Sequence, residues 1–328
     1  MRRREVITFI SSVALAWPLV VRAQQKGRVQ TVGILWHAGS VEAEAIFLTQ
    51  IQDGLQVLGY VEGRNLTLAN TFADEQYERF NSNAVELVRR KVDVLVAVTL
   101  EAALAAQRAT KTIPTVFIVV PDPVGAKLVA SLAHPGGNIT GLSTLAVDLL
   151  AKRLELFKEI VGPMSGIALL VNPSAPESTE DSIKQVQVAA ERLGLTFQAT
   201  RAAQPDQIER AFSSLQDSIN GVVIQDDAMF FNERKQIAAL ALQRRLPTAA
   251  FVSPMVEDGA LMTYASNPRA IFRRSAVYID KILKGAKPEE LPVEQPTNFE
   301  LVINLRTAKA LGLTIPETLL TRADKVIE

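Results

Sequence analysis

The fold is decided by a stretch that the chain uses twice. Residues 29–60 read VQTVGILWHAGSVEAEAIFLTQIQDGLQVLGY, an apolar strand pattern followed by a helical pattern that ends at Gly59. Residues 166–195 read GIALLVNPSAPESTEDSIKQVQVAAERLGL, the same order with a glycine at Gly194, 135 residues later. Two further pairs keep a similar spacing: Val94-Leu95-Val96 with Val222-Val223-Ile224, and Pro114 with Pro247. The repeat predicts two α/β lobes of like construction that face each other across a ligand cleft.

Short apolar runs alternate with amphipathic segments along the rest of the chain. This pattern is typical of parallel strands that crossover helices cover on both faces. The expected strands span 31–36, 66–70, 94–98, 115–120, 166–171, 197–200, 222–225, 248–252 and 261–264. The predicted fold class is therefore α/β, with two Rossmann-like lobes that contain parallel sheets.

The order of elements also indicates where the chain changes lobe. After a turn at 135–138, residues 139–143 are expected to form a strand that leaves the first lobe. A helix over 268–284 is expected to return to that lobe before the chain ends in the second. We therefore predict a first lobe of residues 28–141 plus about 260–290, and a second lobe of residues 142–259 plus about 291–328. A three-strand hinge would join them.

The N-terminus has the features of an export signal. Arg2-Arg3-Arg4 precedes a mostly apolar stretch at 6–21, and a small-residue pattern ends at Ala23. The stretch is shorter than the roughly 20 apolar residues of a membrane-spanning helix, and Pro18 interrupts it. We expect residues 1–23 to be cleaved near Ala23 and the protein to be periplasmic. The paired arginines also fit a twin-arginine signal, so the export route stays open.

Composition excludes several classes of function. Without residues 1–23 the chain has 305 residues, enough for two domains that each bury a core. It then carries 31 Lys and Arg against 34 Asp and Glu, a net charge near −3, so no basic field would hold nucleic acid or an anionic membrane. The chain has no cysteine, which excludes disulfides, thiolate metal sites and a lipid-modified N-terminal Cys.

Motifs for covalent chemistry are missing from the sequence. It contains no G-x-G-x-x-G, no G-x-x-x-x-G-K-[ST] and no G-x-S-x-G. The two histidines are His37, at the end of the first strand, and His134, in a loop pattern. No group of carboxylates and histidines has the spacing of a metal site. We therefore expect no catalytic residue, no metal and no cofactor.

Candidate ligand-binding residues follow the strands, because ligands of open α/β sheets bind outside the carboxyl ends of the strands. Thr99 is placed to cap a helix whose free backbone N–H groups would seat a carboxylate. Asn172 and Ser174 repeat this arrangement in the second lobe. Asp226 and Asp227 end another second-lobe strand, and at least one of them would pair with a ligand amine.

Aromatic residues at strand ends add to this set, and every candidate also has a structural interpretation. Trp36, His37 and Tyr264 would form walls for the body of the ligand. Alternatively, Trp36 packs between the lobes and Tyr264 is half buried in its own lobe. The alternative for the polar candidates is a role only as helix caps or solvated loop residues. Only their convergence on one cleft favours ligand binding.

Several longer motifs resemble a single family. They are GLQVLGYVEGRN at 54–65, DPVGA at 122–126, HPGGNITG at 134–141, ILKGAKP at 282–288 and LVINLRTAKALG at 301–312. In this order, and over essentially the whole mature chain, they resemble the tryptophan/tyrosine-type ABC transporter substrate-binding proteins. The resemblance implies a type I periplasmic binding protein fold with three crossings between the lobes. It also implies delivery of a captured solute to a membrane permease driven by a separate ATPase.

The resemblance transfers to individual residues only in part. The helix start after the third strand is matched by Thr99, Leu100 and Glu101, where amino-acid-binding members often show a Thr-Pro-Ala-Ala type sequence. Glu101 places a negative charge near the expected carboxylate seat, which weighs against an amino-acid ligand. The acidic position after the second-lobe strand is matched best by Asp227. Asp122, in the second motif, joins the candidate ligand-binding residues.

Together these features predict a monomeric periplasmic receptor whose lobes close by hinge motion on one small organic solute. The solute would be amino-acid-like, or aromatic and planar, and the partners would be a permease and its ATPase. No nucleic acid partner is expected, and no membrane insertion once the signal is removed. Two alternatives stay open: a sensing protein that partners a membrane kinase, and an exported two-lobed enzyme in which Asp226, Asp227 and His37 are acid and base groups.

Overall fold

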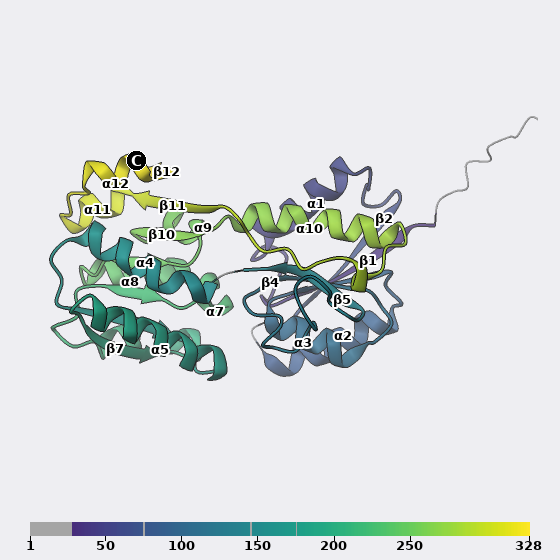
Figure 1. The fold of residues 1–328 in the computed structure, drawn as a ribbon, viewed down its shortest axis with the longest axis horizontal. Coiled ribbons are helices and arrows are strands. Elements are labelled where there is room, and N and C mark those ends of the chain that lie inside the picture. The colour runs from purple at the N-terminus through teal and green to yellow at the C-terminus, as the bar shows by residue number, and fades with distance from the viewer. Residues whose placement is uncertain (1–27, 75, 145, 175) are drawn as a thin grey trace, which may run out of the picture.

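The computed structural model describes residues 28–74, 76–144, 146–174 and 176–328. The expected export signal at 1–23, with its cleavage near Ala23, lies outside these residues. The described chain folds into two lobes, each with a β-sheet between helices (Figure 1). Within this part of the chain, no helix has both the length and the apolar character needed to cross a bilayer.

The first lobe is built on a five-stranded sheet with the order β2-β1-β3-β4-β5. All neighbouring strands pair in parallel. In that order the strands are β2 (Leu66–Phe72), β1 (Gln30–Trp36), β3 (Val94–Val98), β4 (Thr115–Val120) and β5 (Ile139–Ser143). The central strands β3 and β4 have nearly continuous apolar sequences, as expected for strands buried on both faces of the sheet, whereas the edge strand β2 is partly polar.

The second lobe repeats this sheet and extends it to seven strands, in the order β12-β11-β10-β9-β8-β6-β7. The strands are β6 (Gly166–Val171), β7 (Thr196–Arg201), β8 (Val222–Ile224), β9 (Thr248–Ala250), β10 (Met262–Ser266), β11 (Phe299–Asn304) and β12 (Lys325–Ile327). The order β7-β6-β8-β9-β10 reproduces that of the first sheet, so the predicted repeat is confirmed. β11 runs antiparallel to β10 and pairs in parallel with β12, and neither strand is among those expected.

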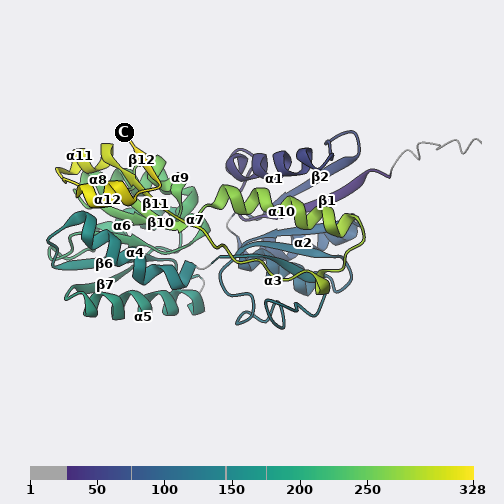
Figure 2. The same cartoon turned by 45° about the horizontal axis from the view of Figure 1, so that its top comes forward.

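Helices cover both faces of the first sheet (Figure 2). They are α1 (Ala45–Val57) and α10 (Pro268–Leu283) on one face, and α2 (Tyr77–Arg89) and α3 (Leu100–Ala109) on the other. Alternate side chains of β1 point to opposite faces of the sheet, as the two-residue repeat of a strand requires. Ile34 and Trp36 join the apolar cluster of α1 and α10, and Leu35 joins that of α2 and α3.

Helices of the second lobe also form two apolar clusters with their sheet. Leu169 shares a cluster with α4 (Ala146–Val161), α5 (Pro176–Arg192), α11 (Leu305–Leu311) and α12 (Glu317–Arg322). Leu170 shares the other with α6 (Ile208–Ser213), α7 (Ala228–Asn232), α8 (Arg234–Gln243) and α9 (Ser253–Glu257). Two short 3₁₀ helices span Pro205–Gln207 and Pro288–Glu290. The cluster of Leu170 also contains Ile34, so apolar contact is continuous between the lobes.

Three chain segments cross between the lobes, after β5, between β10 and α10, and before β11. The backbone N–H of Ser143 donates to the carbonyl of Glu294 (2.9 Å), and the N–H of Glu294 donates to the carbonyl of Gly141 (3.0 Å). The side-chain amide of Asn267 donates to Glu300 (2.8 Å). These bonds connect the first crossing to the third and the third to the second, so the three-strand hinge acts as one linked unit.

The expected lobe boundaries differ from the structure in two places. β10 forms hydrogen-bonded pairs with β9 and β11, so residues 262–266 belong to the second sheet rather than to the first lobe. Residues 291–293 stay with the first lobe, where the Thr140 hydroxyl donates to the carbonyl of Leu291 (2.6 Å). We propose the boundaries near residues 144, 267 and 295.

Helices α1 and α10 approach most closely at Gly54. A Cβ atom at Gly54 would lie 2.7 Å from the Cβ of Ala276 and 2.7 Å from the carbonyl oxygen of Arg273. We expect Gly54→Val to force the helices apart and lower the free energy of unfolding by about 1–3 kcal/mol, measured by urea unfolding. Gly137→Val is the matched control, because nothing lies within 4 Å of a Cβ built there. Equal losses in both variants would contradict the close approach.

Candidate functional site

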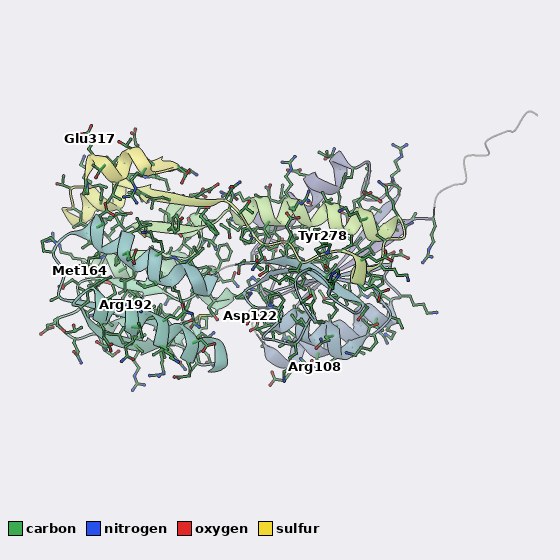
Figure 3. The ribbon with its side chains drawn as sticks, viewed as in Figure 1. Arg108, Asp122, Met164, Arg192, Tyr278 and Glu317 are labelled. Carbon is green, nitrogen blue, oxygen red and sulfur yellow. The ribbon has the colours of Figure 1, made fainter. Side chains whose placement is uncertain are left out.

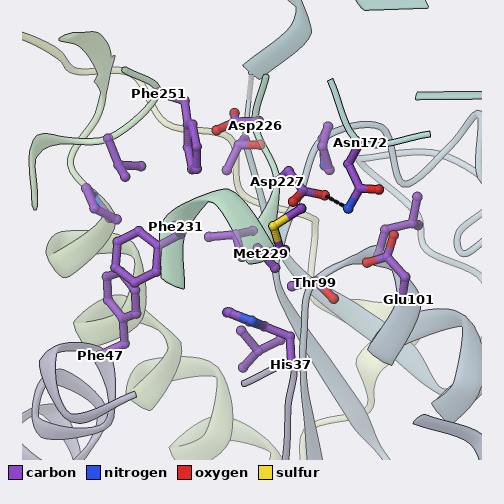
Figure 4. Close-up of a pocket in the computed structure, with 18 of the residues that line it drawn as sticks. His37, Phe47, Thr99, Glu101, Asn172, Asp226, Asp227, Met229, Phe231 and Phe251 are labelled. Atoms are coloured by element: carbon purple, nitrogen blue, oxygen red, sulfur yellow. Dashed lines mark hydrogen bonds between the residues drawn. The ribbon is translucent and has the colours of Figure 1, made fainter. Parts of the chain in front are cut away.

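A cavity of about 740 Å³ lies between the two lobes. Its wall includes Val98 and Val119 near the ends of β3 and β4 in the first lobe, and Asn172 and Asp226 just after β6 and β8 in the second. Figure 4 shows side chains from both lobes converging on it. The volume falls within the range of sites for small organic ligands. The site therefore lies at the carboxyl ends of the strands, as the topology rule requires.

Eight of the eleven candidate residues line this cavity. They are His37, Thr99, Leu100, Glu101, Asn172, Ser174, Asp226 and Asp227. The structure thus brings together the strand ends that the sequence singled out in both lobes. Contact of these side chains with a solute stays a prediction.

The other three candidates are not among the residues that line this cavity. Trp36 is fully buried, where its indole N–H donates to Asn70 (2.8 Å) and its ring stacks on Phe272. Tyr264 packs its ring against Phe299. Asp122 lies near the junction of the lobes (Figure 3), and its carboxylate accepts from the N–H of Gly125 (2.8 Å).

Thr99 has a strained backbone and an unsatisfied hydroxyl. Its φ of 90° and ψ of 168° fall in a region that side chains other than glycine rarely adopt. The hydroxyl does not cap α3 as expected, and its oxygen is buried with no hydrogen-bond partner among the described residues. Val119, on the neighbouring strand, also lines the cavity with a positive φ of 57°. Strain of this kind concentrates at ligand sites.

His37 is held by a buried carboxylate. Its Nε2 lies 3.2 Å from Glu44, whose side chain is fully buried at the start of α1. The same carboxylate accepts from the backbone N–H of Ala38 (3.2 Å). This arrangement orients the imidazole at the cavity wall.

Asn172 and Asp227 form one network in the second lobe. The amide of Asn172 donates to Asp227 (3.0 Å), shown as the dashed line in Figure 4, and its carbonyl oxygen accepts from the N–H of Ser174 (3.0 Å). Asp227 also caps α7 by accepting from the N–H of Phe230 (3.1 Å). The capping interpretation is therefore confirmed for Asp227, whereas Asn172 accepts from a loop N–H ahead of α5. The network fixes the orientation of both side chains at the cavity wall.

Arg153 and Asp226 are neighbouring charged groups of the site, of which Arg153 is fully buried and Asp226 is partly exposed. Burial raises the pKa of Asp226 to about 6, although the neighbouring guanidinium of Arg153 acts against this rise. Burial likewise lowers the pKa of Arg153. Sequence reasoning missed Arg153, which lies three residues after Leu150 and four before Phe157. A charged residue on the apolar stripe of a helix is the signal that would have found it.

Aromatic side chains join the lobes beside the cavity. Phe47 of α1 lies 4.4 Å from Phe272 of α10 in a stacked pair, and 5.1 Å from Phe231 of α7, measured between ring centroids. The pair Phe47 and Phe231 spans the two lobes (Figure 4). All three rings line the cavity. The sequence offers no signal for this contact, because each ring belongs to an ordinary apolar stripe of its helix.

Comparison with known proteins identifies the family. Residues 39–327 match the family described as ABC transporter substrate binding protein. The chain belongs to this family. The expected resemblance is thus confirmed, as is the fold of two parallel-sheet lobes typical of type I periplasmic binding proteins.

Relatives of this substrate-binding protein include one with a named ligand. The tyrosine-binding protein of Clostridioides difficile (strain R20291) is 27% identical over 278 residues, covering 84% of this chain and 78% of that protein. The solved structure of an ABC domain from Streptococcus pneumonia in complex with L-Trp is 25% identical, has a TM-score of 0.82 and covers 91% of this chain and 99% of that one.

A second solved structure indicates how the lobes are placed. It is the ligand-free, open structure of a substrate binding protein with adhesive properties from Clostridium difficile, also 25% identical. It covers 92% of this chain and 99% of that one, with a TM-score of 0.66. At equal identity the present structure is closer to the L-Trp complex, which agrees with the ring contact between Phe47 and Phe231.

Relief of strain at Thr99 gives a test of the site. Thr99→Gly should raise the free energy of unfolding by about 1 kcal/mol, because about 1–3 kcal/mol of backbone strain exceeds the entropic cost of glycine. Denaturant unfolding measures this change. Thr67→Gly, at an exposed position of β2, is the control and should destabilise. A loss of stability in both variants would contradict strain at Thr99.

Asp226 should make stability depend on pH. Its pKa of about 6 lies above the ordinary value of 3.8, so the folded protein keeps a proton that the unfolded chain releases between these values. Stability from this group is present at low pH and falls as pH rises through about 4 to 6. The advantage of Asp226→Asn over the wild type should therefore grow by about 1 kcal/mol from pH 5 to pH 8, measured by urea unfolding. A difference that does not change with pH would contradict the raised pKa.

Proposed function

We propose that this protein is the solute-binding component of an ABC importer, and that it captures one small organic molecule between its lobes. The observation that carries the proposal is the cavity, which residues at the strand ends of both lobes line. Motion about the three crossing segments would open and close it. Membership of the substrate-binding family supports the role in transport.

The chemistry of the cavity supports an amino-acid-like or aromatic solute. Phe47 and Phe231 offer apolar faces for a planar body, while Glu101 and Asp227 would accept hydrogen bonds from donors on the solute. The relatives named for tyrosine and solved with L-Trp point to the same class. We infer an aromatic amino acid or a close analogue as the first candidate.

The proposed binding mode uses groups from each lobe. The hydroxyl of Thr99, which has no partner among the described residues, would hydrogen-bond a polar group of the solute. Asn172 and Ser174 would contribute from the opposite lobe, and Asp227 would hold a donor. Closure would then remove the solute from water, which strengthens each of these polar contacts.

Membership of the family supports a proposal for delivery and location. We infer that the closed, loaded protein docks as a monomer on an ABC permease whose ATPase is a separate chain. We also infer that residues 1–23 direct export and that the receptor works in the periplasm, where it meets the solute before the membrane.

A thermal-shift screen of residues 24–328 tests the proposal first. A solute that binds only the folded protein raises its melting temperature, with about 2.7 kcal/mol of stabilisation at 100 times Kd. We expect one chemical class, led by aromatic amino acids, to do so among amino acids, aromatic acids, purines, ureas and small sugars. Thr99→Val should reduce the shift, whereas the same substitution at the exposed Thr67 should not.

Recovery of the solute separates a receptor from an enzyme. After incubation with the protein, chromatography should return the bound solute unchanged. Its consumption would favour an exported enzyme, in which Asp226 would be the first group to replace. Failure of every class in the screen to raise the melting temperature would contradict the receptor function.

A further inference from the structure

Arg153 stands out among the residues of the cavity wall. It is the only Lys or Arg among the described residues that line the cavity. Its side chain, on α4 of the second lobe, is fully buried. The Nε atom donates to the carbonyl oxygen of Tyr264 (3.4 Å). Both terminal guanidinium nitrogens are buried without a hydrogen-bond partner among the described residues.

A purely structural role does not account for this guanidinium. Buried polar groups in folded proteins are almost always hydrogen-bonded, and a buried charge without a partner costs several kcal/mol. Asp226 is the acidic group whose charge acts on Arg153, yet no hydrogen bond joins the two side chains. Two strong donors are thus held inside a cavity wall with nothing in the described chain to satisfy them.

We propose that the two terminal nitrogens of Arg153 bind a carboxylate of the solute. This assignment rests on the proposed receptor function, since it names a chemical group bound in the same cavity. Because Nε already donates to the Tyr264 carbonyl, the free edge of the guanidinium is its terminal one. Two parallel N–H donors on that edge match the two oxygens of a carboxylate.

The acidic residues of the wall then define the rest of the solute. Glu101 lies in the first turn of α3 and opposes an anion at that helix start, where the sequence alone predicts the carboxylate seat. With Arg153 as the anion site, the carboxylate faces the second lobe. The donors of the solute face Glu101 and the Thr99 hydroxyl in the first lobe and Asp227 in the second. The solute class is a small carboxylic acid that also carries an ammonium or another hydrogen-bond donor.

Arg153→Met tests the assignment, with Lys152→Met as the matched control. Lys152 precedes Arg153 on α4 but is half exposed and pairs with Glu155 (3.0 Å). Without added solute, Arg153→Met should melt about 2–4 °C above the wild type, because it removes a buried charge whose terminal nitrogens have no hydrogen-bond partner among the described residues. Asp226 can then take up a proton, since burial raises its pKa to about 6, so no second charge is left unpaired.

The second readout compares the acid that gives the largest shift in the screen with its primary amide. Titration calorimetry should show that wild-type protein binds the amide about 30-fold more weakly than the acid. Arg153→Met should lose a similar factor for the acid and bind both compounds alike, whereas Lys152→Met should behave as the wild type.

Two results would overturn the proposal. One is a melting temperature of Arg153→Met below that of the wild type with Lys152→Met unchanged, which would make Arg153 a structural partner of Asp226. The other is a wild-type protein that does not select for a carboxylate. This would be seen as equal binding of acid and amide, or as a best solute without a negative charge. If no solute binds at all, the receptor function fails, and the melting temperatures without solute still decide the role of Arg153.

Discussion

Parallel strands joined by crossover helices all end at the same edge of their sheet, and this constraint brings the polar groups that follow the strands to one cavity. Because the first five strands of each lobe share one order, the two sheets present equivalent edges to each other. Thr99 after β3 and Asn172 after β6 are far apart in sequence, yet both reach one cavity. Covered on both faces, the sheets leave only these edges free for polar chemistry.

The strands, the helices and the internal repeat are predictable from the sequence. The face of the sheet on which each side chain lies is harder to predict. Buried strands and their crossover helices follow from apolar runs, and the repeat from the spacing of Gly59 and Gly194. Trp36 was misplaced because neighbouring strand residues point to opposite faces, so that Trp36 enters the core while His37 lines the cavity. β11 and β12 were not predicted from the sequence. They are held by pairing with distant strands, β11 with β10 and β12 with β11, rather than by a local pattern.

Groups that depend on tertiary contact were the least predictable part of the site. The hydroxyl of Thr99 was expected to cap α3, but the backbone at φ 90° directs it elsewhere. Asp227 and Asn172 do satisfy local backbone groups, as their residue types suggest. In the sequence, Arg153 is one charged residue of a predicted helix, and only the folded structure shows that its side chain is buried. The site thus combines well-satisfied residues that hold the wall in place with two unsatisfied ones that face the cavity.

The ring contact between Phe47 and Phe231 has a consequence for how selective such a receptor can be. The contact is made by the protein's own side chains, so it favours closure whatever the cavity contains. A solute then needs to supply only the remaining free energy to shift the population of closed molecules. In the proposed transport role, the same preference would let empty receptors adopt the shape that a permease recognises and compete with loaded ones for docking. The strength of one aromatic pair would then set a compromise between capture at low solute concentration and unproductive docking.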